Sequence, residues 1–93
     1  MLLIIGRLRI SPNNQANFVA LARELIAHER QQPGCMGFDI LQDVSDSNAF
    51  IMLEQWQDRT ALDRHLNSDD LAGSEEQLNK LLDGEPQWEE YDI

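Results

Sequence analysis

The chain has one cysteine, Cys35, among its 93 residues. A single thiol cannot form an intrachain disulfide, and it cannot build a zinc site by itself. No apolar run approaches the roughly 20 residues that a membrane helix needs. The start, Met1 to Ile5, is apolar but lacks the basic leader and the cleavage site of a secretory signal. We therefore expect a cytoplasmic protein.

Basic residues are also scarce. Seven Lys and Arg stand against 17 Asp and Glu, which gives a formal net charge of -10. Proteins that bind nucleic acids neutralise phosphates with Lys and Arg, and anionic lipid surfaces require the same residues. The composition therefore argues against nucleic-acid and membrane partners, and the spread of acids over the second half favours a role in solubility.

Several chemical motifs are absent. The sequence has no glycine-rich phosphate loop, no cluster of metal ligands, and no Ser/His/Asp grouping with a nucleophile elbow. We therefore expect no cofactor and no metal, so any catalysis has to proceed without them.

The hydrophobic pattern predicts one domain over residues 1–93. Period-2 alternation predicts strands, and a 3.6-residue period predicts helices. Met36, Phe38 and Ile40 are expected on one face of the second strand. The predicted elements are strand 2–10, helix 12–32, strand 35–44, strand 49–57, a helix from about residue 59 to 83 with a kink or new cap at 67–70, and strand 87–93.

This β-α-β-β-α-β order indicates an α+β, ferredoxin-like fold with an antiparallel sheet. Right-handed connections place both helices on one face of the sheet. The other face also carries apolar side chains, so we expect it to be covered by a second copy of the chain. The predicted assembly is a homodimer that forms an α/β barrel.

The strand Phe50 to Trp56 and the histidine that follows it are the strongest candidates for chemistry. Side chains two apart on a strand share a face, so Glu54 and Trp56 point the same way as Met52. A carboxylate on an apolar face needs a partner, and His65 lies near the middle of the next helix's apolar arc. We expect His65 to lie over Trp56 and Glu54 with a hollow between them.

Two interpretations of these residues stay open at this stage. In the first, His65 is a general base, Glu54 orients it, and Trp56, Phe38 and Met52 bind the substrate. In the second, His65 only packs and hydrogen-bonds to a carboxylate, while the aromatic residues belong to the core.

Three segments resemble the antibiotic biosynthesis monooxygenase family, in its quinol monooxygenase branch. They are Pro33 to Asp39, Phe50 to Trp56, and Ala61 to Leu66. The resemblance implies a dimeric α/β barrel in which Glu54, Trp56, His65 and Phe38 line a slot. It also implies that O₂ oxidises an electron-rich quinol or phenol without metal or flavin.

The sequence departs from that family at one place. Many relatives have a Ser-Pro-His-aromatic segment after the first histidine, whereas this chain has Ser68-Asp69-Asp70-Leu71, so the second histidine is replaced by Asp70. Strand one also lacks the asparagine of the haem-degrading branch. The leading hypothesis is a cofactor-independent monooxygenase. The alternatives are a non-catalytic dimer that binds a small ligand and an isomerase or signal-processing relative.

Overall fold

The computed structural model describes residues 1–93 and contains one four-stranded sheet. The ferredoxin-like α+β order predicted from the sequence is confirmed, and the second predicted helix is divided into two. The elements are β1 (Leu2–Arg9), a short 3₁₀ turn η1 (Pro12–Asn14), α1 (Gln15–Glu29), β2 (Cys35–Asp43), β3 (Asp46–Trp56), α2 (Arg59–Leu66), α3 (Asp69–Asn79) and β4 (Gln87–Asp92).

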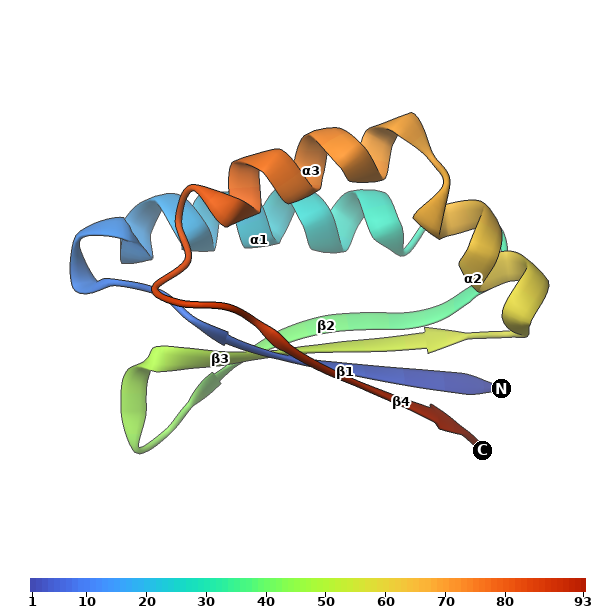
Figure 1. The fold of residues 1–93 in the computed structure, drawn as a ribbon, viewed down its shortest axis with the longest axis horizontal. Coiled ribbons are helices and arrows are strands. Elements are labelled where there is room, and N and C mark those ends of the chain that lie inside the picture. Colours follow the sequence, from blue (N-terminus) through green and yellow to red (C-terminus); the bar gives the residue numbers. More distant parts are fainter.

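The sheet has the strand order β2-β3-β1-β4, and every neighbouring pair is antiparallel. All three helices lie on one face of it, with α1 and α3 side by side and α2 at one end (Figure 1). We call this face of the sheet the inner face and the opposite one the outer face. The register places the inner-face residues in cross-strand rows, one of which is Phe38–Glu54–Ile4–Glu90 and the next Ile40–Met52–Gly6–Trp88.

Polar caps explain where the second helical segment divides. The carboxylate of Asp58 accepts a hydrogen bond from the backbone N–H of Ala61 at 2.9 Å and begins α2. The hydroxyl of Ser68 accepts one from the N–H of Leu71 at 3.2 Å and begins α3. The polar break is therefore a new cap. The last helix ends at Asn79, before the predicted end at residue 83.

The first helix is shorter than predicted. Residues 12–14 form the 3₁₀ turn, and the α-helix itself ends at Glu29, with turns at residues 30–32. Ser11 precedes the turn in an extended conformation, but its side chain makes no capping hydrogen bond.

Two apolar clusters fill the space between the helices and the inner face. The larger one packs α1 and α3 on the middle of the sheet, and its members are Leu8, Ile10, Phe18, Leu21, Ala22, Leu25, Phe38, Phe50, Met52 and Leu78. The smaller one packs α2 on the end of the sheet, and its members are Leu2, Ile4, Trp56, Ala61 and Leu62. Burial of these side chains holds α2, and therefore His65, in a fixed place over β3.

Gly34 determines how closely α2 approaches the sheet. Its φ is +81°, a value that residues with a Cβ rarely adopt, and a Cβ at this position would lie 2.4 Å from the Cβ of Ala61. Gly84 has a similar φ of +89° but open space around it. A comparison of substitutions at the two glycines therefore distinguishes the cost of backbone strain from the cost of steric overlap.

We expect Gly34→Ala to be clearly more destabilising than Gly84→Ala. Both substitutions bring backbone strain of about 1–2 kcal/mol. Gly34→Ala adds overpacking against α2 of about 1–3 kcal/mol. Denaturant unfolding of the two variants and the wild type measures the difference. Equal losses of free energy of unfolding would show that the contact with Ala61 does not constrain α2.

Candidate active site

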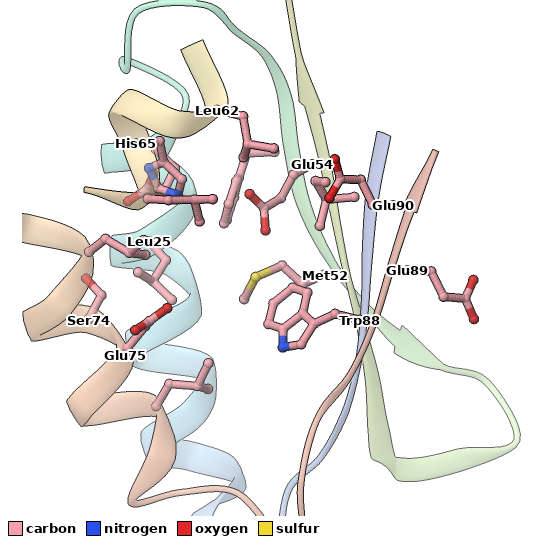
Figure 2. A pocket seen from close by; sticks show the side chains of 16 residues that line it. Leu25, Met52, Glu54, Leu62, His65, Ser74, Glu75, Trp88, Glu89 and Glu90 are labelled. Carbon is pink, nitrogen blue, oxygen red and sulfur yellow. The ribbon is translucent and has the colours of Figure 1, made fainter. Parts of the chain in front are cut away.

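A cavity of about 360 Å³ lies between the inner face of the sheet and the helices (Figure 2). Its size is within the range of small-molecule sites, about 300–1,000 Å³. Apolar residues form most of its wall, and polar groups enter from the sheet and from each of the helices. It is lined by Ile4, Leu25, Glu29, Phe38, Met52, Glu54, Leu62, His65, Leu66, Leu71, Ser74, Glu75, Leu78, Trp88, Glu89 and Glu90.

The sequence analysis named five site residues, and the structure brings four of them to this cavity. His65, Glu54, Phe38 and Met52 all line it. Trp56 does not, because its side chain is completely buried behind the cavity wall. The expectation that Trp56 forms a wall of the slot is therefore wrong in this structure. Its side chain instead lies behind the wall, in contact with His65.

His65 stacks directly on Trp56. The centroids of the two rings are 4.5 Å apart and their planes differ by 26°. No hollow separates them, contrary to the expectation from sequence, and the cavity lies beside the stacked pair. The indole fixes the plane of the imidazole, which is itself only 6% exposed.

The acidic partner of His65 is Glu29, not Glu54 as expected. Oε2 of Glu29 lies 3.0 Å from Nδ1 of His65, which is ion-pair distance. This oxygen is displaced from the direction of the ring N–H, so the contact is electrostatic and the oxygen accepts no aligned hydrogen bond. Glu29 is only 2% exposed and ends α1, where the helix dipole disfavours a negative charge. The imidazole of His65 offsets part of both costs through a proton on Nδ1, and more of them once the ring is positively charged.

Glu54 has a different partner. Its Oε1 accepts a hydrogen bond of 3.1 Å from Nε1 of Trp56, two residues further along the same strand. Burial raises the pKa of the Glu54 carboxyl above its ordinary value; the Trp56 N–H and the charge of His65 partly oppose this rise, and Glu29 adds to it. Glu54 therefore keeps a proton to higher pH than an exposed glutamate does.

These contacts form one continuous chain of groups from the sheet through α2 to α1. Glu54 bonds to Trp56, Trp56 stacks on His65, and His65 meets Glu29. The arrangement holds an imidazole at a cavity wall between two acids. Such a group can take a proton from a bound hydroxyl and keep the resulting positive charge beside a carboxylate.

Glu29 and Trp88 line the cavity but were not among the site residues predicted from the sequence. Glu29 follows Leu25 by four residues and Ala22 by seven, so it continues the buried stripe of α1, and an acid on that stripe was a usable signal. Trp88 reaches the cavity only because β4 pairs with β1 in a register that sets it beside Gly6 on the inner face. Nothing local in the sequence determines that register.

Two other candidate groups lie apart from this chemistry. Asp70, where the family resemblance led us to expect a second histidine, lies 3.4 Å from Nε2 of His28, and both side chains are largely exposed. Burial raises the pKa of the Cys35 thiol, so it stays protonated and is a poor nucleophile. No group of three His, Cys, Asp or Glu side chains is placed to hold a metal ion. None of the helices is long and apolar enough to span a membrane.

The chain belongs to the antibiotic biosynthesis monooxygenase family, whose profile matches residues 1–76. A solved structure of an antibiotic biosynthesis monooxygenase superposes with a TM-score of 0.91 and is 29% identical, with 100% of this chain and 98% of that chain covered. The fold and the sequence therefore agree on the family.

Two relatives of known sequence show the same similarity. "Putative monooxygenase YcnE" of Bacillus subtilis is 29% identical over 65 residues, which cover 70% of this chain and 68% of that protein. "Uncharacterized protein sll1783" of Synechocystis is 30% identical over 67 residues, 72% of this chain. The match covers 46% of the Synechocystis protein, so this chain corresponds to less than half of it.

We expect Glu54→Gln to stabilise the protein increasingly as the pH rises above 4.5, the ordinary value for a glutamate. Below that pH the carboxyl is protonated in the folded and unfolded states. Above it the unfolded chain ionises first, so the folded wild type loses stability until the pH passes the raised pKa of Glu54. Glutamine does not titrate, and its amide oxygen can still accept from Trp56.

Thermal melts of wild type and Glu54→Gln at a series of pH values measure this effect. Glu24→Gln, at an exposed position of α1, controls for the loss of one negative charge. A Tm difference between Glu54→Gln and wild type that stays constant or shrinks with rising pH would contradict the assigned direction.

Proposed function

We propose that the protein is a cofactor-independent monooxygenase that oxidises a small quinol or phenol with O₂. The observation that carries the proposal is the imidazole of His65, held at the cavity wall between Glu29 and the indole of Trp56. Membership of the antibiotic biosynthesis monooxygenase family supports it.

His65 acts as the general base in this proposal. Its Nδ1 faces Glu29, which leaves Nε2 as the ring nitrogen that accepts the proton of a substrate hydroxyl. The negative charge of Glu29 stabilises the imidazolium that forms, as a carboxylate does beside a catalytic histidine. Glu29 therefore takes the supporting role first considered for Glu54.

The reaction balances without a metal or an organic cofactor. The deprotonated ring gives electrons to O₂, and a ring carbon forms a bond to one oxygen of the resulting peroxide. Loss of the proton from that carbon then breaks the O–O bond, leaving a carbonyl on the ring and releasing the other oxygen as water. The substrate supplies all the electrons, so the protein has to supply a base, an orientation and exclusion of water.

The cavity wall suits such a ring. Phe38 on β2 and Met52 on β3 present apolar surface to the cavity, and both residues are almost fully buried. Protonated Glu54 can donate a hydrogen bond to a second ring oxygen. An apolar site of this kind binds an aromatic ring and strengthens the electrostatic effect of Glu29 on His65.

A second candidate function is that of a dimer that binds a small ligand without turnover. Asp70 favours it, because this chain pairs Asp70 with His28 at the protein surface where relatives carry a second histidine. A ligand that raises the Tm without O₂ consumption or product formation would support this alternative.

We expect His65→Gln to lower the rate of O₂ uptake with a reactive hydroquinone by about 100-fold or more, because a general base contributes about 10²–10⁴. We expect Glu29→Gln to lower it less, by about tenfold, since the imidazolium loses its neighbouring charge. An oxygen electrode and product analysis measure both effects. His28→Gln, the other histidine and exposed, is the matched control.

Two outcomes would contradict this assignment. If His65→Gln folds and oxidises the hydroquinone at the wild-type rate, His65 is not the base. If wild type consumes no O₂ with any of a panel of hydroquinones and phenols, the oxygenase proposal fails and the alternative of a ligand-binding dimer without turnover is favoured.

The outer face of the sheet supports a homodimer as the working assembly. No helix covers it, and it carries half-buried or exposed apolar side chains in three rows: Leu3 and Tyr91; Ile5 and Leu53; and Leu41 and Ile51. The same rows also contain the charged residues Asp39, Arg7 and Glu89. An uncovered group of apolar side chains of this size is typical of an interface, and packing of two such faces would form the α/β barrel.

We expect wild type to sediment as a dimer at micromolar concentration and Leu53→Glu to sediment as a monomer, because a charge at the centre of the outer face opposes burial. Val44→Glu is the control, because Val44 is fully exposed at the tip of the β2–β3 hairpin. A monomeric wild type, or a dimer in all three proteins, would contradict this interface.

A further inference from the structure

The ionisable side chains around the cavity are almost all acidic. Its lining contains five glutamates but no lysine or arginine, and His65 is the single basic residue. Glu89 points away from the cavity (Figure 2). Glu29 faces His65, and Glu90 pairs with Arg59 outside the lining. Glu54 and Glu75 have no lysine or arginine partner. Because the lining contains neither residue type, an anionic group on a ligand would also find no such partner there.

Glu75 lies at the more exposed side of this cavity. It belongs to α3, and its carboxylate extends toward the hollow in which the indole of Trp88 stands (Figure 2). Charges near a partly closed, low-dielectric site act more strongly than they do in water. A carboxylate on a ligand would meet repulsion there, whereas an ammonium group would gain a partner.

Trp88 supplies an aromatic surface inside the same cavity. It lies on the inner face next to Gly6, where a Cβ would come within 2.5 Å of Cζ3 of the indole, so the ring covers the bare backbone of the glycine. Half of Trp88 (50%) is nevertheless exposed. Because the residue lines the cavity, this exposed aromatic surface is available to a bound ring.

Trp88 lies outside the residues that the family profile matches, although a solved structure of the family superposes over the whole chain. The family profile ends at residue 76, before β4 begins at Gln87. The base and its acid come from the matched part of the chain, whereas the aromatic surface comes from the part beyond it.

We propose that the cavity selects an aromatic ring without an anionic group, uncharged or carrying an amine, and that this ring stacks on the indole of Trp88. The inference rests on the proposed function to the extent that an aromatic substrate occupies the site. It adds the charge class of that substrate and the residue that positions it.

Three catechols whose ring substituents differ in charge, and to a smaller extent in length, test the inference. They are 4-methylcatechol, which is neutral, dopamine, which is cationic, and 3,4-dihydroxyphenylacetate, which is anionic. Titration calorimetry with O₂ excluded measures their binding without turnover. We expect the anionic compound to bind at least about tenfold more weakly than the other two, because like charges in a partly desolvated site repel.

Variants test the stacking on Trp88 and the selection by charge separately. We expect Trp88→Ala to weaken binding of the neutral and cationic compounds by about tenfold, and Trp88→Phe to retain most of the affinity. Val44→Ala is the control, because Val44 is an apolar residue that is fully exposed at the tip of the β2–β3 hairpin and does not line the cavity. Glu75→Gln should remove any advantage of the cationic over the neutral compound and leave binding of the neutral one unchanged.

Several results would overturn the inference: equal binding of the anionic compound, unchanged affinity in Trp88→Ala, or no binding of any of the three catechols. Selective binding that depends on Trp88 but leads to no O₂ uptake in air would support the inference while contradicting the oxygenase function. Rapid oxidation of the anionic compound would support the oxygenase function while overturning the charge class.

Discussion

The contact between Glu29 and His65 is the interaction on which the rest of the site depends. A carboxylate that is 2% exposed at the carboxyl end of a helix is costly, because water is excluded and the helix dipole has the wrong sign. His65, in the last turn of α2, is the group that compensates for it. The contact accounts for the burial of both side chains, and it joins α1 to α2 above the sheet.

The register of the sheet then determines what the imidazole faces. Glu54 and Trp56 share the inner face of β3, so one acid lies beside the cavity and one indole lies under the histidine. β4 pairs with β1 so that Trp88 covers Gly6 on the same face. The cavity is therefore bounded by an imidazole, apolar walls and an aromatic surface, with acids but no lysine or arginine in its lining.

Local patterns predicted much of this architecture. Period-2 alternation placed Glu54, Trp56 and Met52 on one face, and helical spacing placed His65 inward, because both rules depend only on neighbouring residues. Met36 breaks the first rule: it is exposed because a register shift between Cys35 and Gly37 inserts an extra residue in β2.

The partner of His65 could not be read from such local rules. Glu54 is close in sequence, but Glu29 reaches the histidine because α1 and α2 pack on the same face, which is a tertiary property. Trp88 likewise depends on strand pairing between the two ends of the chain. The dimer and the substrate each involve a second molecule, which no local rule of this sequence determines, and both remain proposals.

The protonation of the His65 ring tests the central claim most directly. Nitrogen-15 chemical shifts of the imidazoles, with exposed His28 as the internal reference, report which ring nitrogen carries the proton in the neutral form. The account predicts that it sits on Nδ1, facing Glu29, that Nε2 is free to accept, and that Glu29→Gln weakens this preference. A proton on Nε2 of His65, unaffected by the change at Glu29, would contradict it.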